Sequence, residues 1–143
     1  MKITQEVDYA LRVVLYLSKI GYGEKVDAKT ISDLENIPHR FLLKLLRKLN
    51  AANIVRSFRG VHGGYALNKL PEEITIYDVV LAIDGPIYVN RCLSDPASCN
   101  ISRTGVCEIH RALSMVQNNI IHDLKSISFK DLLNKSSKIS MGT

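Results

Sequence analysis

The sequence predicts a mainly α-helical fold with one small β-hairpin and a long helix near its C-terminal end. Apolar residues recur at three- and four-residue steps in several segments, which is typical of amphipathic helices. Residues 54–67 alternate instead around a glycine-rich centre, which indicates a hairpin. With 143 residues, 46% of them hydrophobic, the chain fits one domain with an ordinary core.

The first helix is predicted to begin after Thr4 and to end at Gly21, because Thr4 is a good N-cap and glycine stops a helix. Its apolar stripe consists of Val7, Ala10, Leu11, Val14 and Leu17. Asp8 lies near the positive start of this helix, where a carboxylate is favoured. We interpret Asp8 as surface charge or as a candidate ligand.

Two short helices joined by a tight turn follow. Asp27 caps the first, residues 28–35, on which Ile31 and Leu34 are expected to face inward. Pro38 marks the start of the second, because proline is tolerated only in the first turn. The inward face of the second helix carries Phe41, Leu42, Leu45, Leu46 and Leu49. Such a pair is a helix-turn-helix, whose second helix enters the major groove of DNA.

Positive charge is concentrated around this helix pair. Residues 1–70 contain twelve Lys or Arg against six Asp or Glu, whereas residues 71–143 contain seven against eight. No acidic residue lies between positions 39 and 59, which indicates a polyanion-binding surface, with a solvated helix face as the alternative. We expect base-edge or groove-wall contacts from His39, Arg40 and Lys44, and phosphate contacts from Arg47 and Lys48.

The predicted hairpin directly follows the second helix, so it is a wing. Arg59 is placed to enter a minor groove, where narrow A·T-rich tracts attract guanidinium groups. His62 and Gly63, in the glycine-rich tip, are further candidates for DNA contacts. The glycines are also compatible with a phosphate-binding loop, but no strand-loop-helix arrangement follows them.

Thr75 and Asp78 form a capping-box-like start to a further helix, which ends at Gly85. Its apolar residues are Ile76, Val79, Val80 and Ile83. A long amphipathic helix is predicted after Cys107, with a stripe of Ile109, Leu113, Val116, Ile120, Ile121 and Leu124. Such a stripe packs against its own domain or against the same helix of a second subunit. We favour a homodimer, because a protein with two-fold symmetry suits a palindromic operator.

All three cysteines lie in one stretch that reads as a loop. Six residues separate Cys92 from Cys99 and seven separate Cys99 from Cys107. We expect a cytoplasmic protein without a membrane segment, because neither a spanning apolar run nor a signal-peptide pattern is present. In that reducing compartment, three cysteines indicate metal binding or redox chemistry in place of structural disulfides.

Four features are highly specific when they occur together. They are the opening MKIT followed by Asp8-Tyr9-Ala10-Leu11-Arg12, the wing Arg59-Gly60 with Gly63-Gly64-Tyr65, the helix end Ile83-Asp84-Gly85-Pro86, and the clustered cysteines. By these features the chain resembles, over almost its full length, the Rrf-two type of winged helix-turn-helix transcriptional regulators, which includes IscR, NsrR, RirA and CymR. The resemblance implies a homodimeric regulator and not an enzyme. In the cluster-binding branch the three cysteines hold an iron-sulfur cluster, usually 2Fe-2S and in some members 4Fe-4S.

The resemblance implies that Cys92, Cys99 and Cys107 are the cluster ligands. The fourth ligand would be His110, or Asp8 supplied by a partner subunit. We favour His110, because one helical turn places it on the same face as Cys107. The cysteine intervals are longer than the usual five and five of the family.

The predicted organisation has four parts. A winged helix-turn-helix DNA-binding domain spans residues 1–86, and its first helix also packs on the dimer helix. The cysteine loop spans 87–107, the dimerisation helix and a short C-terminal helix span 108–134, and a frayed tail spans 135–143.

The predicted function is that of a transcriptional regulator, in the simplest case a repressor, that binds double-stranded DNA. It would sense iron-sulfur cluster status, redox state or nitric oxide. One alternative is a cluster-free regulator with a zinc ion or a thiol switch. A more remote one is a small iron-sulfur electron carrier or redox enzyme. The missing fourth cysteine and the absence of a Ser-His-Asp or Cys-His arrangement at a recognisable spacing argue against it.

Overall fold

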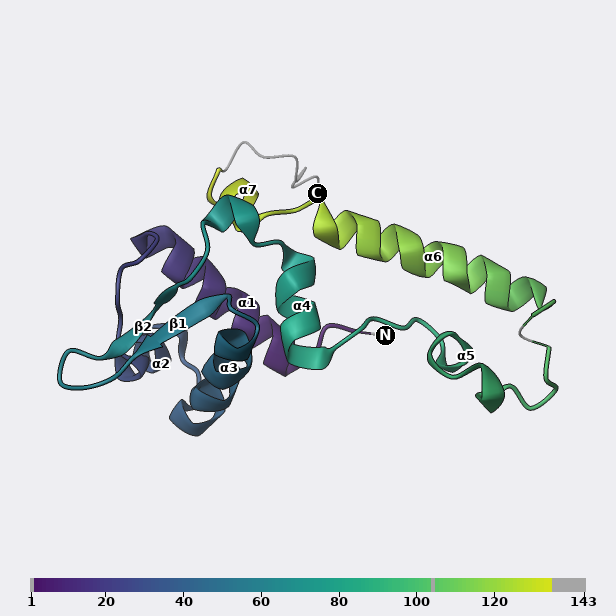
Figure 1. Cartoon of the computed structure of the whole chain (residues 1–143), viewed down its shortest axis with the longest axis horizontal. Coiled ribbons are helices and arrows are strands. Elements are labelled where there is room, and N and C mark those ends of the chain that lie inside the picture. The colour runs from purple at the N-terminus through teal and green to yellow at the C-terminus, as the bar shows by residue number, and fades with distance from the viewer. Residues whose placement is uncertain (1, 104, 135–143) are drawn as a thin grey trace.

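In the computed structural model, which describes residues 2–103 and 105–134, the helices and the hairpin occur in the predicted order (Figure 1). The elements are α1 (Gln5–Ile20), α2 (Ala28–Glu35), α3 (His39–Ala51), β1 (Val55–Phe58), β2 (Gly64–Leu67), η1 (Pro71–Glu73), α4 (Ile76–Asp84), α5 (Arg91–Ser94), η2 (Pro96–Ser98), α6 (Glu108–Lys125) and α7 (Phe129–Leu133). The predicted fold class is therefore confirmed. The predicted tail, residues 135–143, lies outside the described residues.

The helix starts follow from their caps. The side chain of Thr4 accepts a hydrogen bond from the Val7 N–H, and that of Asp27 accepts one from the Thr30 N–H. Thr75 and Asp78 form the predicted reciprocal capping box at the start of α4. These bonds satisfy N–H groups that have no partner inside the helix, so the predicted starts of these three helices are confirmed.

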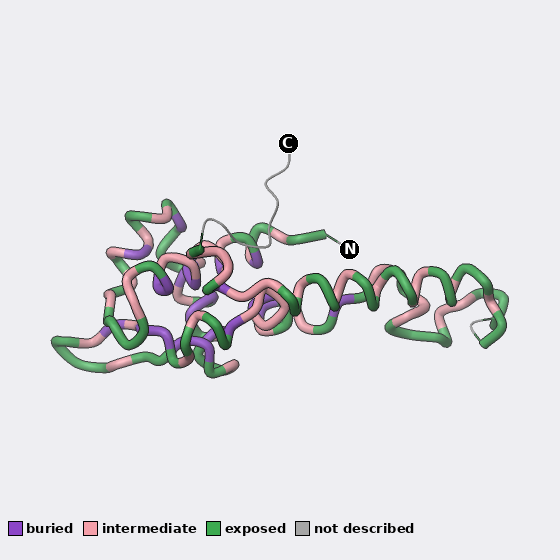
Figure 2. Tube along the Cα trace, turned by 90° about the horizontal axis from the view of Figure 1, so that it is seen from above, coloured by how far each residue is buried: buried purple, intermediate pink, exposed green. Residues whose placement is uncertain are grey.

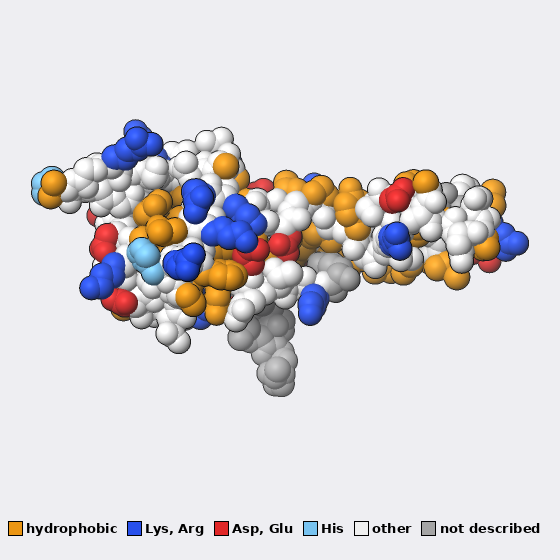
Figure 3. Space-filling model, turned by 90° about the horizontal axis from the view of Figure 1, so that it is seen from below, with side chains coloured by type: hydrophobic (Ala, Val, Ile, Leu, Met, Phe, Trp, Pro, Cys, Tyr) orange, Lys and Arg blue, Asp and Glu red, His pale blue; other side chains and the backbone are white. Residues whose placement is uncertain are grey.

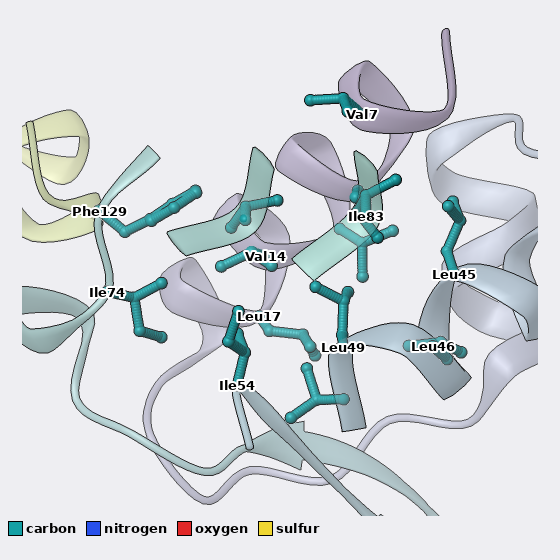
Figure 4. Close-up of a cluster of buried hydrophobic side chains, with 14 of the residues drawn as sticks. Val7, Val14, Leu17, Leu45, Leu46, Leu49, Ile54, Ile74, Ile83 and Phe129 are labelled. Atoms are coloured by element: carbon teal, nitrogen blue, oxygen red, sulfur yellow. The ribbon is translucent and has the colours of Figure 1, made fainter. Parts of the chain in front are cut away.

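The core is formed by buried side chains of α1, α3, α4 and the segments beside them (Figures 2 and 4). Helix α1 packs on α3, α4 and α7. The predicted inward residues of α3 are buried, with Phe41 half-buried at the edge. Leu34 is a wrong prediction, because 62% of its surface is exposed. The left-handed turn at Asn36 brings Ile37 into the core, and Ile31 is the buried residue of the two-turn helix α2.

The wing is an antiparallel pair in which Val55 lies opposite Leu67 and Phe58 opposite Gly64. Val26, ahead of α2, extends this pair through two backbone hydrogen bonds with Tyr65. Gly64 permits that approach, because a Cβ there would lie 2.8 Å from the carbonyl oxygen of Val26. The hairpin projects from the side of the body opposite α6 (Figure 1).

After Ile87, which is still buried in the core, the chain leaves the globular body and forms an arm, residues 88–103 and 105–125, of which α6 is the longest part (Figure 1). The predicted cysteine loop contains two short helical turns, α5 and η2. Proximal residues Ile121 and Leu124 of α6 pack against the core of the body. Farther out, Ile109 and Val116 are 67% and 47% exposed. The apolar stripe of α6 is thus divided between contact with its own domain and solvent.

The arm returns to the body beside the point where α4 begins. The Ile76 N–H donates to the Ile127 carbonyl oxygen at 3.0 Å, and the Phe129 N–H donates to that of Ile74 at 2.9 Å. Ser128 caps α7 with its own reciprocal bond to Asp131. Phe129 is fully buried. The C-terminal end of the arm is therefore attached to the body by backbone hydrogen bonds and a buried side chain.

Candidate DNA-binding surface and metal centre

The exposed basic side chains of α3 form the first half of a candidate DNA-binding surface. His39 and Arg40 lie in the first turn and are exposed, as are Lys44 and Arg47 farther along. The side chain of Lys44 is 57% exposed, although its ammonium nitrogen lies 3.7 Å from a carboxylate oxygen of Glu6. On the face shown in Figure 3, Lys and Arg side chains gather over the body beside hydrophobic ones, and further hydrophobic side chains extend along the arm.

Lys48 differs from its basic neighbours. Its Nζ lies 2.8 Å from Glu6 Oε1 and donates to the carbonyl oxygen of Ile83 at 3.1 Å. The ammonium group of Lys48 lowers the pKa of the Glu6 carboxyl group through a hydrogen bond and its charge, and Lys44 adds to this effect, although burial opposes it. The ammonium group of Lys48 is therefore engaged by two other residues of the same chain.

The wing places Arg59 and His62 in the open, with Gly63 half-buried between the two sides of the tip. A Cβ at Gly63 would lie 2.5 Å from the carbonyl oxygen of Phe58, so only glycine fits there without a backbone shift. The glycine pattern of the tip therefore has a structural cause.

Sequence reasoning missed Lys25, which supports the wing from outside it. Lys25 Nζ donates to the carbonyl oxygen of His62 at 3.2 Å and lies 5.0 Å from the ring centroid of Phe58. Arg56 lies 5.1 Å from the centroid of the same ring. In the sequence Lys25 only precedes the β-branched Val26, and this position does not predict such a contact.

The candidate metal centre lies along the arm. Cys92, Cys99, Cys107 and His110 all line one cavity of about 420 Å³. The three cysteines are free and half-buried. Cys92 belongs to α5, Cys99 follows η2, and the other two residues belong to the start of α6. Residues that are distant in the sequence are therefore brought to one cavity.

Two of these residues meet at hydrogen-bond distance, since His110 Nδ1 lies 3.2 Å from Cys92 Sγ. Cys107 is the N-cap of α6, and its Sγ accepts a hydrogen bond from the His110 N–H at 3.4 Å. The positive end of the helix dipole lies here and favours an anionic group. The start of α6 is therefore suited to hold a negatively charged ligand set.

Cys99 is made more acidic by its own loop. The Arg103 N–H donates to Cys99 Sγ at 3.5 Å. This bond, together with the Ile101 N–H, lowers the pKa of the Cys99 thiol, and the charge of Arg103 contributes in the same direction. Because the thiolate is the form that binds metals and attacks oxidants, the loop favours the reactive form of Cys99.

The donor set distinguishes between kinds of metal group. Within residues 2–103 and 105–134, no three His, Cys, Asp or Glu side chains are grouped closely enough to hold a single metal ion. Structural zinc requires four ligands around one ion. An iron-sulfur cluster distributes its ligands over several irons, and thiolates with a histidine suit it. Three thiols and an imidazole around one cavity are donors that suit an iron-sulfur cluster.

Asp8, the other candidate for the fourth ligand, lies elsewhere in this chain. It is on α1 with its side chain 61% exposed, and one of its carboxylate oxygens lies 3.6 Å from Arg12 Nε. It does not line the cysteine cavity. Within one chain the structure therefore brings His110, and not Asp8, to the three cysteines.

A basic helix-turn-helix with a glycine-tipped wing defines a DNA-binding regulator of the winged-helix class. The sequence model of the Rrf2 family, described as "Iron-dependent Transcriptional regulator", matches residues 3–135. The chain belongs to the Rrf2 family. It is a DNA-binding transcriptional regulator and not an enzyme.

Individual relatives agree with this assignment. The chain is 34% identical over 137 residues to an HTH-type, Rrf2-like transcriptional regulator of Rhodobacter capsulatus, covering 92% of this chain and 91% of the other. The solved structure of CymR, the global cysteine regulator of B. subtilis, is similar with a TM-score of 0.72 and 28% identity, covering 94% and 97% of the two chains. IscR of T. potens shares the fold, with a TM-score of 0.69 and 21% identity, covering 99% of this chain and 94% of that one.

Among the described residues, no helix combines the length and the apolar character needed to cross a membrane.

Proposed function

We propose that this regulator senses iron-sulfur cluster status, redox state or nitric oxide through a cluster held by Cys92, Cys99 and Cys107, with His110 as the fourth ligand. The observation that carries the proposal is the shared cavity of these four residues. When bound there, a 2Fe-2S or 4Fe-4S cluster would supply a redox-active centre that oxygen and nitric oxide attack.

The chain's own residues provide the connection from this centre to DNA. Cys92 lies on α5, whereas Cys107 is the N-cap of α6 and His110 lies in the first turn of α6. The other end of α6 packs on the body through Ile121 and Leu124. Ligation by residues on both α5 and α6 would therefore constrain the arm that leaves α4. Regulation requires that DNA affinity differ between the loaded and the empty protein.

We further propose that the regulator acts in the cytoplasm as a homodimer on a palindromic operator. The exposed Ile109 and Val116 lie two helical turns apart on the same side of α6 and would form the contact with a second copy. Two copies would present two α3 helices and two wings, which suits an operator with two-fold symmetry. The proposed DNA contacts are His39, Arg40, Lys44, Arg47, Arg59, His62 and Gly63.

The test is anaerobic purification, followed by iron and sulfide analysis and a visible spectrum before and after oxygen or nitric oxide. We expect a coloured protein with iron and sulfide that bleaches on exposure. Cys99→Ser should lose both elements, whereas Ser98→Ala, which changes a neighbour lining the same cavity, should retain them. A colourless protein without iron or sulfide after reconstitution would overturn the cluster proposal.

A second candidate is a thiol switch without a cluster. It is favoured by the Arg103 N–H hydrogen bond to Cys99 Sγ and by the lowered pKa of the Cys99 thiol. In that case the protein would contain no iron, and peroxide would change its DNA affinity in a way that a thiol reductant reverses.

A further inference from the structure

Lys48 lies at a junction of three helices. It belongs to α3, its partner Glu6 belongs to the first turn of α1, and the carbonyl group that it contacts is that of Ile83 near the end of α4. The side chains of Lys48 and Glu6 are 34% and 19% exposed. The contact is therefore a partly buried, charge-assisted one and not a loose surface pair.

The α4 side of this junction is the root of the arm. Carbonyl groups in the last turn of a helix lack partners inside the helix, and a cation there is favourable. Lys48 supplies that cation to Ile83. The next residue, Asp84, accepts a hydrogen bond from the Thr4 hydroxyl group at 3.1 Å, and after Gly85 the chain leaves for the cysteine loop. Both bonds fix the end of α4 to other parts of the body.

Arg47, the neighbour of Lys48 on α3, is exposed, whereas Lys48 would have to leave two partners to reach a phosphate group. We propose that Lys48 is a positioning residue that fixes helix α3 to α1 and to the root of the arm, and that it does not contact DNA phosphates. The proposal rests on the assignment of α3 to DNA. It removes Lys48 from the predicted phosphate contacts.

The first test compares Lys48→Met with Arg47→Met, which remove one positive charge from adjacent positions of the same helix. DNA affinity is measured over a series of salt concentrations. Loss of a phosphate contact lowers the slope of log affinity against log salt by about one, so we expect this for Arg47→Met. Lys48→Met should weaken binding about tenfold, the scale of one charged hydrogen bond, with an unchanged slope. A slope lowered as in Arg47→Met, or an unchanged affinity, would overturn the proposal.

In the second test, the two explanations predict changes of DNA affinity in opposite directions. Glu6 lies near both Lys44 and Lys48, so the test is made in a Lys44→Met background. In that background, Glu6→Gln removes the carboxylate and releases the ammonium group of Lys48 alone. If Lys48 positions α3, Glu6→Gln weakens DNA binding although the protein gains positive charge. If Lys48 serves phosphates, the freed ammonium group strengthens binding. This variant also decides the question if Lys48→Met fails to fold, which circular dichroism detects.

A third measurement separates positioning from general stability. The DNA affinity of anaerobically cluster-loaded protein is compared with that of cluster-free protein. In Lys48→Met the ratio of these two affinities should approach one, because α3 is released from the root of the arm. An unchanged ratio would contradict the link to the arm. If the parent protein takes up no cluster, the proposed sensing function fails, while the salt slope and the Glu6→Gln result still decide the role of Lys48.

Discussion

His110 Nδ1 lies 3.2 Å from Cys92 Sγ, although the two residues are 18 positions apart and belong to different helices. This contact joins α5 to the first turn of α6. The backbone N–H of the same histidine donates to Cys107 Sγ, so one residue contacts two of the three thiols. His110 is therefore the centre of the candidate ligand set within one chain.

His110→Ala should destabilise the cluster, because it removes a ligand. Loss of a supporting residue alone weakens metal binding by about tenfold or more, so cluster loss in air should be at least about tenfold faster. The rate is measured by the decay of visible absorption after anaerobic reconstitution. Asp8→Ala is the matched control and should decay at the parent rate. The opposite pattern, with Asp8→Ala labile and His110→Ala normal, would assign the fourth ligand to the partner's first helix.

Arg59→Ala should weaken binding to duplex DNA by about tenfold at low salt, because it removes an exposed guanidinium group from the wing. The loss should be larger for duplexes with A·T-rich flanks than for duplexes with G·C-rich flanks. Fluorescence anisotropy with both duplexes measures it. Val61→Ala changes a 97% exposed residue at the same tip and should bind as the parent does. Equal binding by Arg59→Ala and Val61→Ala would remove the wing from recognition.

Val116→Glu should convert the proposed dimer to a monomer, because it places a charge in the exposed apolar stripe of α6. Sedimentation equilibrium at micromolar concentration gives the mass. The control, Asn118→Glu, introduces the same charge at an exposed polar position on the other side of the helix. A parent protein that sediments as a monomer would contradict the role of α6 in dimer formation.

The Glu6 carboxyl group should make stability depend on acid. Its pKa in the folded protein lies below the ordinary value of 4.5, chiefly because Lys48 hydrogen-bonds to it. The stabilisation is therefore complete above about pH 5 and is lost as the pH falls below 4.5 and through the folded pKa. Urea unfolding at several pH values should show a contribution of about 1 kcal/mol, the size of a partly exposed ion pair, which is absent in Glu6→Gln. Glu24→Gln, at an exposed position, should keep the acid dependence of the parent.

Local patterns predicted most of the secondary structure, because its causes lie within a few residues. Thr4, Asp27 and Thr75 cap their helices through their own side chains, and Gly85 follows α4 as expected. The hairpin also follows from local alternation and from glycines that the backbone requires. The cysteines and His110 were predicted as one site, and the structure brings them to one cavity.

Contacts between distant segments were not predictable in the same way. A helical period identifies an apolar face but not which part of it finds a partner, so Leu34 was assigned to the core and is exposed. A run of basic residues does not reveal that Glu6, 42 positions earlier, neutralises Lys48. The division of the α6 stripe likewise depends on where α4 lies. Such relationships are set by tertiary packing.

The pairing of Thr75 with Ser128 closes a loop that contains α4 and the entire arm. The entropy cost of closing a loop increases only with the logarithm of its length, so a few added residues change it by a small fraction of 1 kcal/mol. The long cysteine intervals of this chain therefore have little effect on the stability of the body. The number of residues between the thiols can therefore be set by what the metal site requires, without a change in the fold of the DNA-binding part.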